Sequence, residues 1–282
     1  MTTRQQERIA LLCSEFRLPT VAAEVVPRFQ QAEHGAALTT LLEVLELEAG
    51  DRRQRREDRL RRAAKLPAGK TWDLLDATCF PVKLQQQLEE LATAQFLDRA
   101  VNVLAFGLPG TGKTHAMAAL GYRLIEQGHS VLFAPTYKLV QDLLAAKRDL
   151  ELPRALRKLD HFEVLILDDL GYLKHRAEEA EVLFTLIAER YERRSLIVTS
   201  NIVFSQWEEI FQSPMATAAA TDRIVHHSAI LEFDVGSYRT AEAKAMQAPS
   251  QPHAGGSGRP DSEKNTKASP DARTRRKAAR KQ

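Results

Sequence analysis

The sequence predicts an α/β fold, a parallel sheet flanked by helices, preceded by a small all-helical N-terminal domain. From about residue 100 onwards, short apolar runs alternate with helical segments, which is the pattern of a parallel sheet covered on both faces. A glycine-rich stretch, FGLPGTGKTH at 106–115, ends the first of these runs. Ligands of such sheets bind at the carboxyl ends of the strands, so this junction is the first candidate site.

Residues 1–65 form the predicted helical N-terminal domain. Apolar residues recur at helical spacing from Ile9 to Phe16 and again from Leu38 to Leu45, and each set makes one apolar stripe. The last helix continues into residues 51–65, which hold eight Arg or Lys and three acids. Such a helix can contact the phosphates of duplex DNA, or it can be a solvated helix face. The arginines that can share one face are Arg52, Arg55, Arg56, Arg59 and Arg62.

Three further segments complete the expected organisation. Residues 66–81 contain two prolines and a glycine, which predicts a linker that packs on the next domain. Residues 82–240 form the α/β domain. Residues 241–282 lack apolar periodicity, which predicts a disordered tail, and six basic residues without an acid lie between Arg273 and Lys281. This second basic cluster is either another polyanion contact or a solubilising tail.

Five strands and six helical segments are expected in the α/β domain. The apolar runs predict strands at 101–106, 130–134, 164–168, 196–200 and 229–233. Helical patterns predict helices at 82–98, 114–127, 137–148, 153–159 and 178–193, with further helical signals between 204 and 224.

The glycine-rich stretch fits the phosphate-binding loop G-x-x-x-x-G-K-[ST]. In such a loop, backbone N–H groups and the start of the following helix surround phosphate oxygens. Lys113 would contact the β- and γ-phosphates, and the hydroxyl of Thr114 would bind Mg²⁺. The full spacing and the flanking strand and helix disfavour a turn that binds nothing. The predicted nucleotide-binding residues are Gly107, Leu108, Pro109, Gly110, Thr111, Gly112, Lys113, Thr114 and His115.

Polar residues end two later strands of the predicted sheet. Asp168 and Asp169 follow the apolar run at 164–167, some 55 residues after the loop. We expect Asp168 to hold Mg²⁺ and Asp169 to polarise the attacking water. Asn201, at the end of the run 196–200, could hydrogen-bond the γ-phosphate or that water, although a capped strand-to-loop turn is the alternative.

Arg223 lies in a later predicted helix and is the candidate arginine finger. An arginine supplied by another subunit can stabilise the charge that develops during phosphoryl transfer. The alternative is a surface ion pair with Asp222 or another neighbour. The histidines form none of the usual zinc motifs, so His226 and His227 are interpreted as surface or packing residues.

Composition excludes several classes of protein. The chain has 282 residues, is 44% hydrophobic and 27% charged, and has a net charge of +3. No apolar run approaches the roughly 20 residues that span a bilayer, and the N-terminus is not a secretory signal. Two cysteines far apart in sequence fit a reducing compartment. We therefore expect a cytoplasmic protein without a membrane partner.

Taken together, FGLPGTGKTH, VLILDDLGYL, IVTSN and TDRIVHHSAILEF resemble the IstB-like ATP-binding proteins. These are AAA+ ATPases that assist insertion-sequence transposases and are related to DnaC-type helicase loaders. The resemblance covers roughly residues 5–240. It implies an AAA+ P-loop NTPase core that takes ATP and Mg²⁺, a homo-oligomer on duplex DNA with ATP between subunits, and a partner transposase. Arg223 would then serve the site of the neighbouring subunit.

Two departures from the AAA+ pattern affect what is expected. Many AAA+ proteins have Asp-Glu where this chain has Asp168-Asp169, and the shorter aspartate predicts slow hydrolysis that DNA or a partner stimulates. The C-terminal helical lid is expected to be absent, because only the tail follows Ser237–Arg239. Two other functions stay open at this point, a DnaC-type helicase loader and a small-molecule kinase, although a kinase would leave the basic clusters unexplained.

Overall fold

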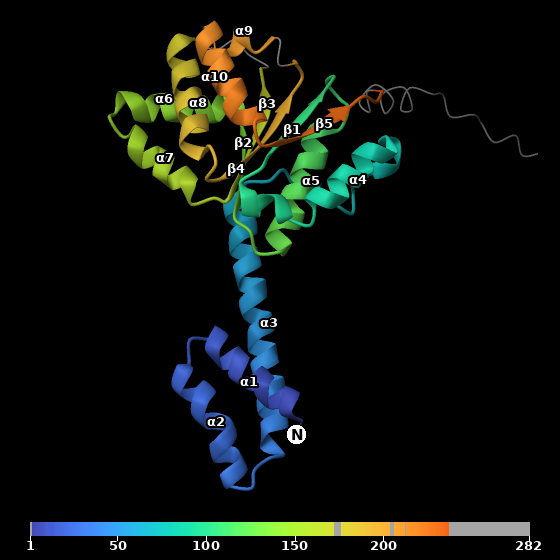
Figure 1. The fold of residues 1–282 in the computed structure, drawn as a ribbon, viewed down its shortest axis with the longest axis vertical. Helices are drawn as coiled ribbons and strands as arrows, with labels where there is room; N and C mark the ends of the chain where they lie inside the picture. Colours follow the sequence, from blue (N-terminus) through green and yellow to red (C-terminus); the bar gives the residue numbers. More distant parts are fainter. Residues whose placement is uncertain (1, 172–175, 204–205, 212, 237–282) are drawn as a thin grey trace, which may run out of the picture.

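The computed structural model places a sheet domain at one end of the molecule and a small helical domain at the other, joined by one long helix (Figure 1). The structure describes residues 2–171, 176–203, 206–211 and 213–236. The predicted tail at 241–282, its basic cluster at 273–281, the end of the α/β domain at 240 and the segment Ser237–Arg239 lie outside the described residues. Among the described residues, β5 is the last element, so the expected absence of a lid concerns residues outside the described ranges.

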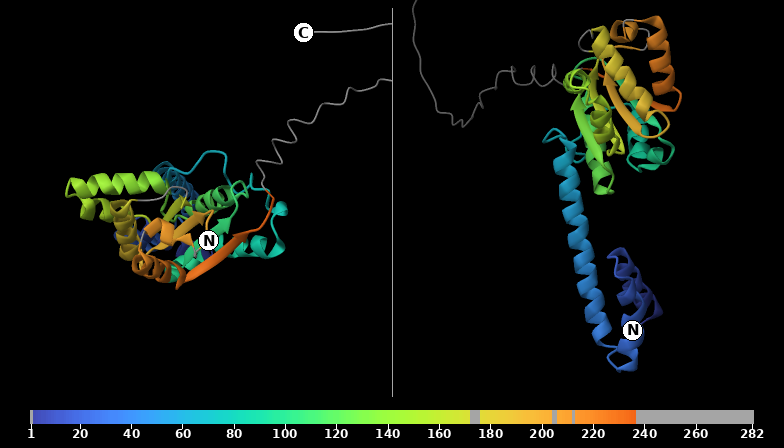
Figure 2. Two further views of the ribbon diagram at one scale, coloured as in Figure 1. Left: turned by 90° about the horizontal axis from the view of Figure 1, so that it is seen from above. Right: turned by 90° about the vertical axis from the view of Figure 1, so that its left-hand side faces the viewer.

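The N-terminal domain is a three-helix unit. It consists of α1 (Thr3–Glu15), α2 (Pro19–Gln31) and the first half of α3 (Ala37–Ala64). Ile9, Leu12 and Leu38 are completely buried among these helices, as their helical spacing predicts. The second half of α3 leaves this unit as a stalk and reaches the sheet domain (Figure 2). At 28 residues, α3 is about 42 Å long, so the two domains are well separated.

The sheet has five parallel strands in the order β2-β3-β4-β1-β5. The strands are β1 (Asn102–Gly107), β2 (Val131–Pro135), β3 (Val164–Leu170), β4 (Ser195–Ser200) and β5 (Ser228–Phe233). Each strand lies within two residues of its predicted bounds, so the predicted parallel sheet is confirmed. All five strands point the same way, and β1, β3 and β4 are interior strands, so their carboxyl ends meet at one edge.

Helices cover both faces of the sheet, because alternate residues of each strand are apolar on opposite sides. Val103 and Ala105 face one layer, whereas Leu104 and Phe106 face the other. The first layer contains α4 (Val82–Leu91) and α5 (Lys113–Glu126). The second contains α6 (Thr136–Arg148), α7 (Leu152–Asp160), α8 (Ala177–Arg190), α9 (Glu208–Phe211) and α10 (Pro214–Val225). Two short 3₁₀ helices lie at Ala77–Cys79 and Gln95–Arg99.

The predicted helix at 82–98 is wrong in its second half. α4 ends at Leu91, and a separate 3₁₀ turn covers Gln95–Arg99. Ala94, between them, has φ 64°, a left-handed conformation that no α-helix can contain. Because Ala94 is also buried, the tertiary packing of the turn overrides the helical propensity of the sequence.

Helix α3 meets the sheet domain at what we call the stalk joint, formed by Arg56, Arg61, Glu126 and Gly128. Arg56 donates to the carbonyl oxygen of Gly128 at 2.9 Å, and Arg61 pairs with Glu126 at 3.2 Å. Both acceptors lie at the carboxyl end of α5, whose amino end follows the phosphate loop. The stalk therefore contacts the far end of the helix that leaves the loop.

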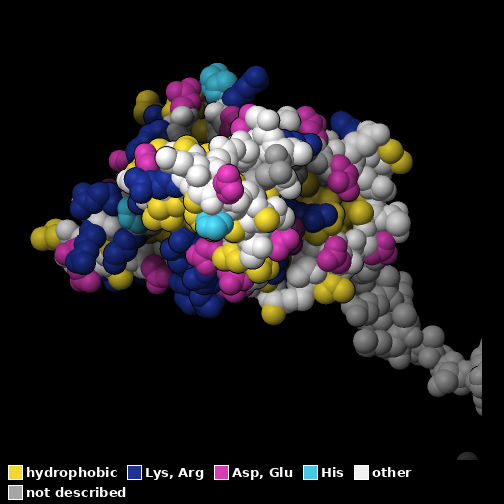
Figure 3. Space-filling view, turned by 90° about the horizontal axis from the view of Figure 1, so that it is seen from below, with side chains coloured by type: hydrophobic (Ala, Val, Ile, Leu, Met, Phe, Trp, Pro, Cys, Tyr) yellow, Lys and Arg dark blue, Asp and Glu magenta, His cyan; other side chains and the backbone are white. Residues whose placement is uncertain are grey.

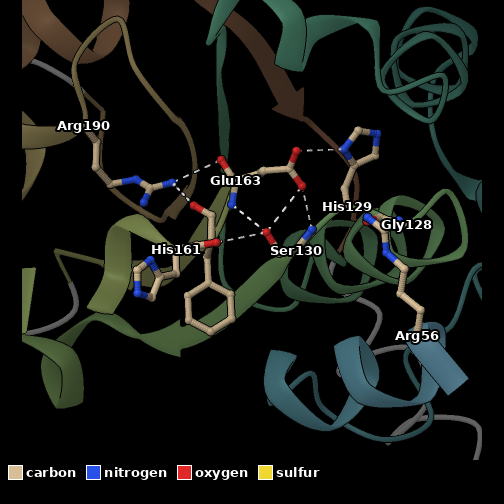
Figure 4. Close-up of polar contacts among 8 residues, drawn as sticks. Arg56, Gly128, His129, Ser130, His161, Glu163 and Arg190 are labelled. Atoms are coloured by element: carbon tan, nitrogen blue, oxygen red, sulfur yellow. Dashed lines mark hydrogen bonds and ion pairs between the residues drawn. The ribbon is translucent and has the colours of Figure 1, made fainter. Parts of the chain in front are cut away.

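A polar network lies behind the stalk joint, at the amino ends of β2 and β3 (Figure 4). The Glu163 carboxylate accepts from the backbone N–H of Ser130 at 2.8 Å and lies 3.4 Å from His129 Nδ1. Burial opposes ionisation of Glu163, but these hydrogen bonds outweigh it and lower its pKa. Arg190 donates to four backbone carbonyls, among them those of Phe162 and Glu163. The network fixes the turn that Arg56 contacts.

Among the described residues, no helix combines the length and apolarity that crossing a membrane needs. Helix α3 is long enough, but it carries seven arginines between residues 52 and 62.

Candidate nucleotide site and arginine face

The phosphate loop connects the end of β1 to the start of α5, as its motif predicts. Gly107 has φ 153°, and a Cβ there would lie 2.6 Å from the carbonyl oxygen of Phe233. Gly112 has φ 92°, and a Cβ would lie 3.2 Å from the ring of Phe80. Both positions favour glycine: a side chain at Gly107 would collide with the backbone of Phe233, and one at Gly112 would be strained by the positive φ and would have to displace the Phe80 ring.

Lys113 is folded over the loop. Its side chain is 5% exposed, and Nζ donates to the carbonyl oxygens of Gly107 at 2.7 Å and Leu108 at 2.9 Å. Thr111 adds a hydrogen bond from its hydroxyl to the Leu108 carbonyl at 2.9 Å. The ammonium group is therefore held at the loop, where a bound phosphate could replace the carbonyl oxygens as its partner.

The two predicted Mg²⁺ ligands lie side by side. Asp168 is 8% exposed, and the hydroxyls of Thr199 and Thr114 both hydrogen-bond its carboxylate, the first at 2.8 Å. Burial is the largest cause of a raised pKa for Asp168, the negative charge of Asp169 adds to it, and the two hydroxyls oppose it. A buried carboxylate beside a second carboxylate is stabilised strongly by a bound cation. Asp168, with Asp169 next to it, therefore fits a divalent metal site.

Thr199 connects the two acids. Its hydroxyl donates to Asp168 Oδ1 and accepts from the backbone N–H of Asp169, each at 2.8 Å. Asp169 itself is exposed and has φ 57°, which aims its side chain differently from that of Asp168. The Thr199 hydroxyl on β4 thus helps to set the positions of both acids on β3.

A cavity of about 450 Å³ lies over the loop. Its walls are the loop and the start of α5 from Pro109 to His115, the side chains of Asp169 and Asn201, and the linker between Lys70 and Phe80. A cavity of this size falls within the usual range for small-molecule sites. The structure therefore brings Lys113, Asp169 and Asn201 to one space.

Two polar atoms at this cavity are buried without a hydrogen-bond partner in the described part of the chain, Asn201 Oδ1 and His115 Nε2. Burial is also the main cause that lowers the pKa of His115, which favours its neutral form. Buried polar atoms rarely stay unpaired, so these two indicate a ligand or water that completes the site. The loop, the acids and the unpaired atoms fit a nucleotide with its metal.

Two contributors to the site are not among the predicted residues. Thr199 could have been found, because it and Ser200 are hydroxyl residues at the carboxyl end of the apolar run LIV, where ligands of parallel sheets bind. The linker wall from Lys70 to Phe80 carries no comparable signal, because its approach to the cavity depends on the tertiary fold.

Arg223 lies on α10, away from the cavity that its own chain forms. Its Nη1 donates to the Ala219 carbonyl at 2.9 Å, and its guanidinium lies 5.1 Å from the ring centre of Phe184. It is not among the residues that line the cavity, so the structure does not bring it to Lys113.

The five candidate DNA-binding arginines differ in their contacts. Arg52 and Arg55 pair with Glu48, and Arg52 also lies over the ring of Phe16. Arg56 belongs to the stalk joint. Arg59 and Arg62 are exposed and form no ion pair within the described ranges, so they are the two freest cations of this set. We call the exposed strip of Arg52, Arg55, Arg59 and Arg62 the arginine face.

Basic side chains are not confined to one patch at the end of the molecule seen from below. Figure 3 shows Lys and Arg side chains interspersed with Asp and Glu on that end. A mixed surface attracts DNA weakly, so individual free arginines matter more than the general charge of this end.

The architecture is that of the AAA+ P-loop proteins. The solved structure of DnaI is 19% identical, covers 60% of this chain and 95% of its own, and gives a TM-score of 0.51. A structure of the replication initiator DnaA bound to AMPPCP and single-stranded DNA is 15% identical, covers 67% of this chain and 58% of its own, and gives 0.52. At these identities the likeness establishes the fold.

Within this class, the chain belongs to the family described as IstB-like ATP binding protein, whose model matches residues 12–246. An insertion-sequence ATP-binding protein of Sinorhizobium fredii is 41% identical over 86% of this chain and 82% of its own length. The ATP-binding protein of insertion sequence IS21 from Pseudomonas aeruginosa is 40% identical over 71% and 76%. That of IS5376 from Geobacillus stearothermophilus is 34% identical over 86% and 97%. The predicted resemblance is therefore confirmed.

Proposed function

We propose that this protein is a Mg²⁺-dependent ATPase that assembles on duplex DNA and assists a partner transposase in moving an insertion sequence. The observation that carries the proposal is the cavity lined by Lys113, Thr114, Asp169 and Asn201, which has unpaired buried atoms and lies beside Asp168. Its family and the names of its relatives supply the biological setting.

The residues divide the chemistry among them. Lys113 exchanges the carbonyls of Gly107 and Leu108 for phosphate oxygens, and Thr114 and Asp168 hold the metal. Mg²⁺ held by these residues would supply positive charge against the phosphate oxygens. Asp169 orients and polarises the attacking water. Asn201 forms a further hydrogen bond to the same water. Because Asp169 is one methylene shorter than glutamate, we expect slow turnover until DNA or a partner adjusts its position.

The same proposal gives Arg223 and the arginine face their roles. Arg223 lies outside its own cavity, which leaves it free to act in the site of a neighbouring subunit. The arginine face binds DNA phosphates, with Arg59 and Arg62 as its main contacts. Arg56 contributes less, because the Gly128 carbonyl already holds it.

A transposition helper is favoured over a helicase loader. The named relatives with the highest identities are all ATP-binding proteins of insertion sequences, whereas DnaI and DnaA are similar in fold alone.

Lys113→Ala tests the nucleotide site. Loss of its charge-assisted hydrogen bonds should weaken ATP binding by one to two orders of magnitude, as titration calorimetry would measure. Lys83→Ala, which removes an exposed lysine from α4, is the matched control and should bind as the parent does. Circular dichroism checks that both variants are folded. A folded Lys113→Ala protein with unchanged ATP affinity would refute the proposal.

Mixing two inactive variants tests whether Arg223 acts in trans. Arg223→Ala should bind ATP but not hydrolyse it, whereas Lys113→Ala should bind ATP only weakly and fail to hydrolyse it. A mixed assembly contains some sites that have Lys113 from one subunit and Arg223 from the next, so part of the activity should return. If labelled subunits co-assemble and no activity returns, Arg223 is not the finger.

A further inference from the structure

The linker that follows α3 brings a second lysine to the nucleotide cavity. Lys70 lines the cavity together with Lys113, Thr114 and Asp169. It is half-buried and forms no ion pair with any residue that the structure describes. A half-buried, unpaired ammonium group beside a cavity is costly unless an anion binds there.

Two contacts hold the linker that carries Lys70 against the phosphate loop and α5. The His115 imidazole, next to Thr114 on α5, hydrogen-bonds the backbone of Thr71. Phe80 lies against Gly112 and makes an edge-to-face contact with Phe233, with ring centres 5.3 Å apart. Lys70 is therefore held at the cavity by its neighbours in the chain.

The electrostatics of the site place the charge of Lys70 near the acids as well as near α5. Burial raises the pKa of Asp168 and lowers that of His115, and the positive charge of Lys70 opposes the first effect and adds to the second. Among the described residues, Lys70 and Lys113 are the two cationic side chains that line this cavity. Lys113 belongs to the loop wall of the cavity, and Lys70 belongs to the linker wall.

We propose that Lys70 is a second phosphate contact of this site and binds the terminal phosphate of ATP. This inference rests on the proposed function, because it presumes that the cavity holds ATP. Lys70 lines the cavity together with Asp169, the acid assigned to the attacking water, so its ammonium group serves the phosphate that ATP has and ADP lacks. The contact also links the nucleotide to the stalk, because Lys70 is six residues beyond Ala64, the last residue of α3.

Lys70→Gln tests the assignment through the ratio of two affinities. ATP affinity, measured with Mg²⁺ by titration calorimetry, should fall about tenfold, and ADP affinity should fall less than threefold. Lys70→Arg should keep most of the preference for ATP, and Lys83→Gln should change neither affinity. The inference fails if Lys70→Gln binds ATP within twofold of the parent, or if ADP loses as much as ATP.

The Lys113→Ala variant separates this failure from failure of the proposed function. If Lys113→Ala loses affinity for ATP and Lys70→Gln keeps it, the cavity binds ATP and only the role of Lys70 is wrong. If both variants keep their affinity for ATP, the assignment of the nucleotide site itself is wrong.

Discussion

The nucleotide site and the arginine face are built in opposite ways. At the site, Lys113 and Asp168 are buried and held by hydrogen bonds that fix their positions before any ligand binds. On the arginine face, Arg59 and Arg62 are exposed side chains without a fixed partner in the described chain. The first region can position atoms for chemistry, whereas the second can only attract a polyanion.

This difference decides how each region should respond to substitution. A single change in a pre-organised site removes a defined contact in a shielded place, so its effect should be large and specific. A single change on an exposed face removes one of several interchangeable charges, so its effect should be small and depend on salt. The predictions below run from the largest expected effect to the smallest.

Asp168→Asn should lower ATP hydrolysis at least a hundredfold, because the metal loses its charged ligand. Steady-state phosphate release, measured with and without duplex DNA, checks this. Hydrolysis within threefold of the parent would remove Asp168 from the metal site and weaken the contrast between the two regions.

Thr199→Val should cost roughly ten- to a hundredfold in hydrolysis, because its hydroxyl positions both Asp168 and Asp169. The Mg²⁺ concentration needed for half-maximal rate should rise as well, which a purely structural role would not cause. Thr199→Ser keeps the hydroxyl and should recover most of the activity. Equal rates and equal Mg²⁺ dependence in the Val and Ser variants would contradict this role.

Arg59→Ala with Arg62→Ala should make the salt dependence of DNA binding shallower by about two per bound subunit, since each phosphate contact contributes about −0.9 to the slope. Arg4→Ala with Arg28→Ala removes the same charge from the three-helix domain at the other end of the stalk and is the control. Fluorescence anisotropy across a salt series measures both slopes. Equal slopes in the two double variants would make the arginine face an ordinary solvated surface.

Asp168→Asn should also stabilise the nucleotide-free protein, by on the order of 1 kcal/mol at neutral pH. The folded pKa of Asp168 is raised, so its contribution is favourable only while it is protonated and is lost as the pH rises through the folded pKa. The gain in free energy of unfolding that Asp168→Asn provides should therefore shrink as the pH falls towards the pKa of Asp168 in the unfolded chain. Urea unfolding at several pH values measures it, and a gain that grows on acidification would reverse the assignment.

Arg56→Ala should have the smallest effect, a loss of about 1 kcal/mol or less in the docking of the stalk, because one exposed hydrogen bond to Gly128 disappears. Faster amide exchange at 127–129 would report it. The salt dependence of DNA binding should stay near that of the parent. A slope change of a full unit would instead return Arg56 to the arginine face.

Sequence alone predicted the parts of the molecule that depend on local geometry. The phosphate loop is one continuous motif whose glycines have backbone angles or close neighbours that demand glycine, as at Gly107 and Gly112. The five strands follow from apolar runs of the right length. The position of Asp168 and Asp169 at the carboxyl end of β3 also follows from an apolar run, and parallel strands bring their carboxyl ends together.

The contacts that sequence missed join distant segments of the chain. Thr199 acts on Asp168, 31 residues away, and Arg56 contacts Gly128, 72 residues away. Helical spacing places Arg56 on the same face as Arg52. It cannot show that Arg56 donates a hydrogen bond to the sheet domain. Ala94 breaks the predicted helix at 82–98 for the same kind of reason, since its left-handed turn is fixed by packing.

The size of the protein on duplex DNA, measured by sedimentation with and without ATP and Mg²⁺, tests the central claim most directly. The claim is that a pre-organised nucleotide site controls assembly through an exposed DNA-binding face. It predicts a large assembly only when DNA and Mg²⁺-ATP are both present, and none for Lys113→Ala. An assembly on DNA that is equally large without nucleotide would contradict the claim.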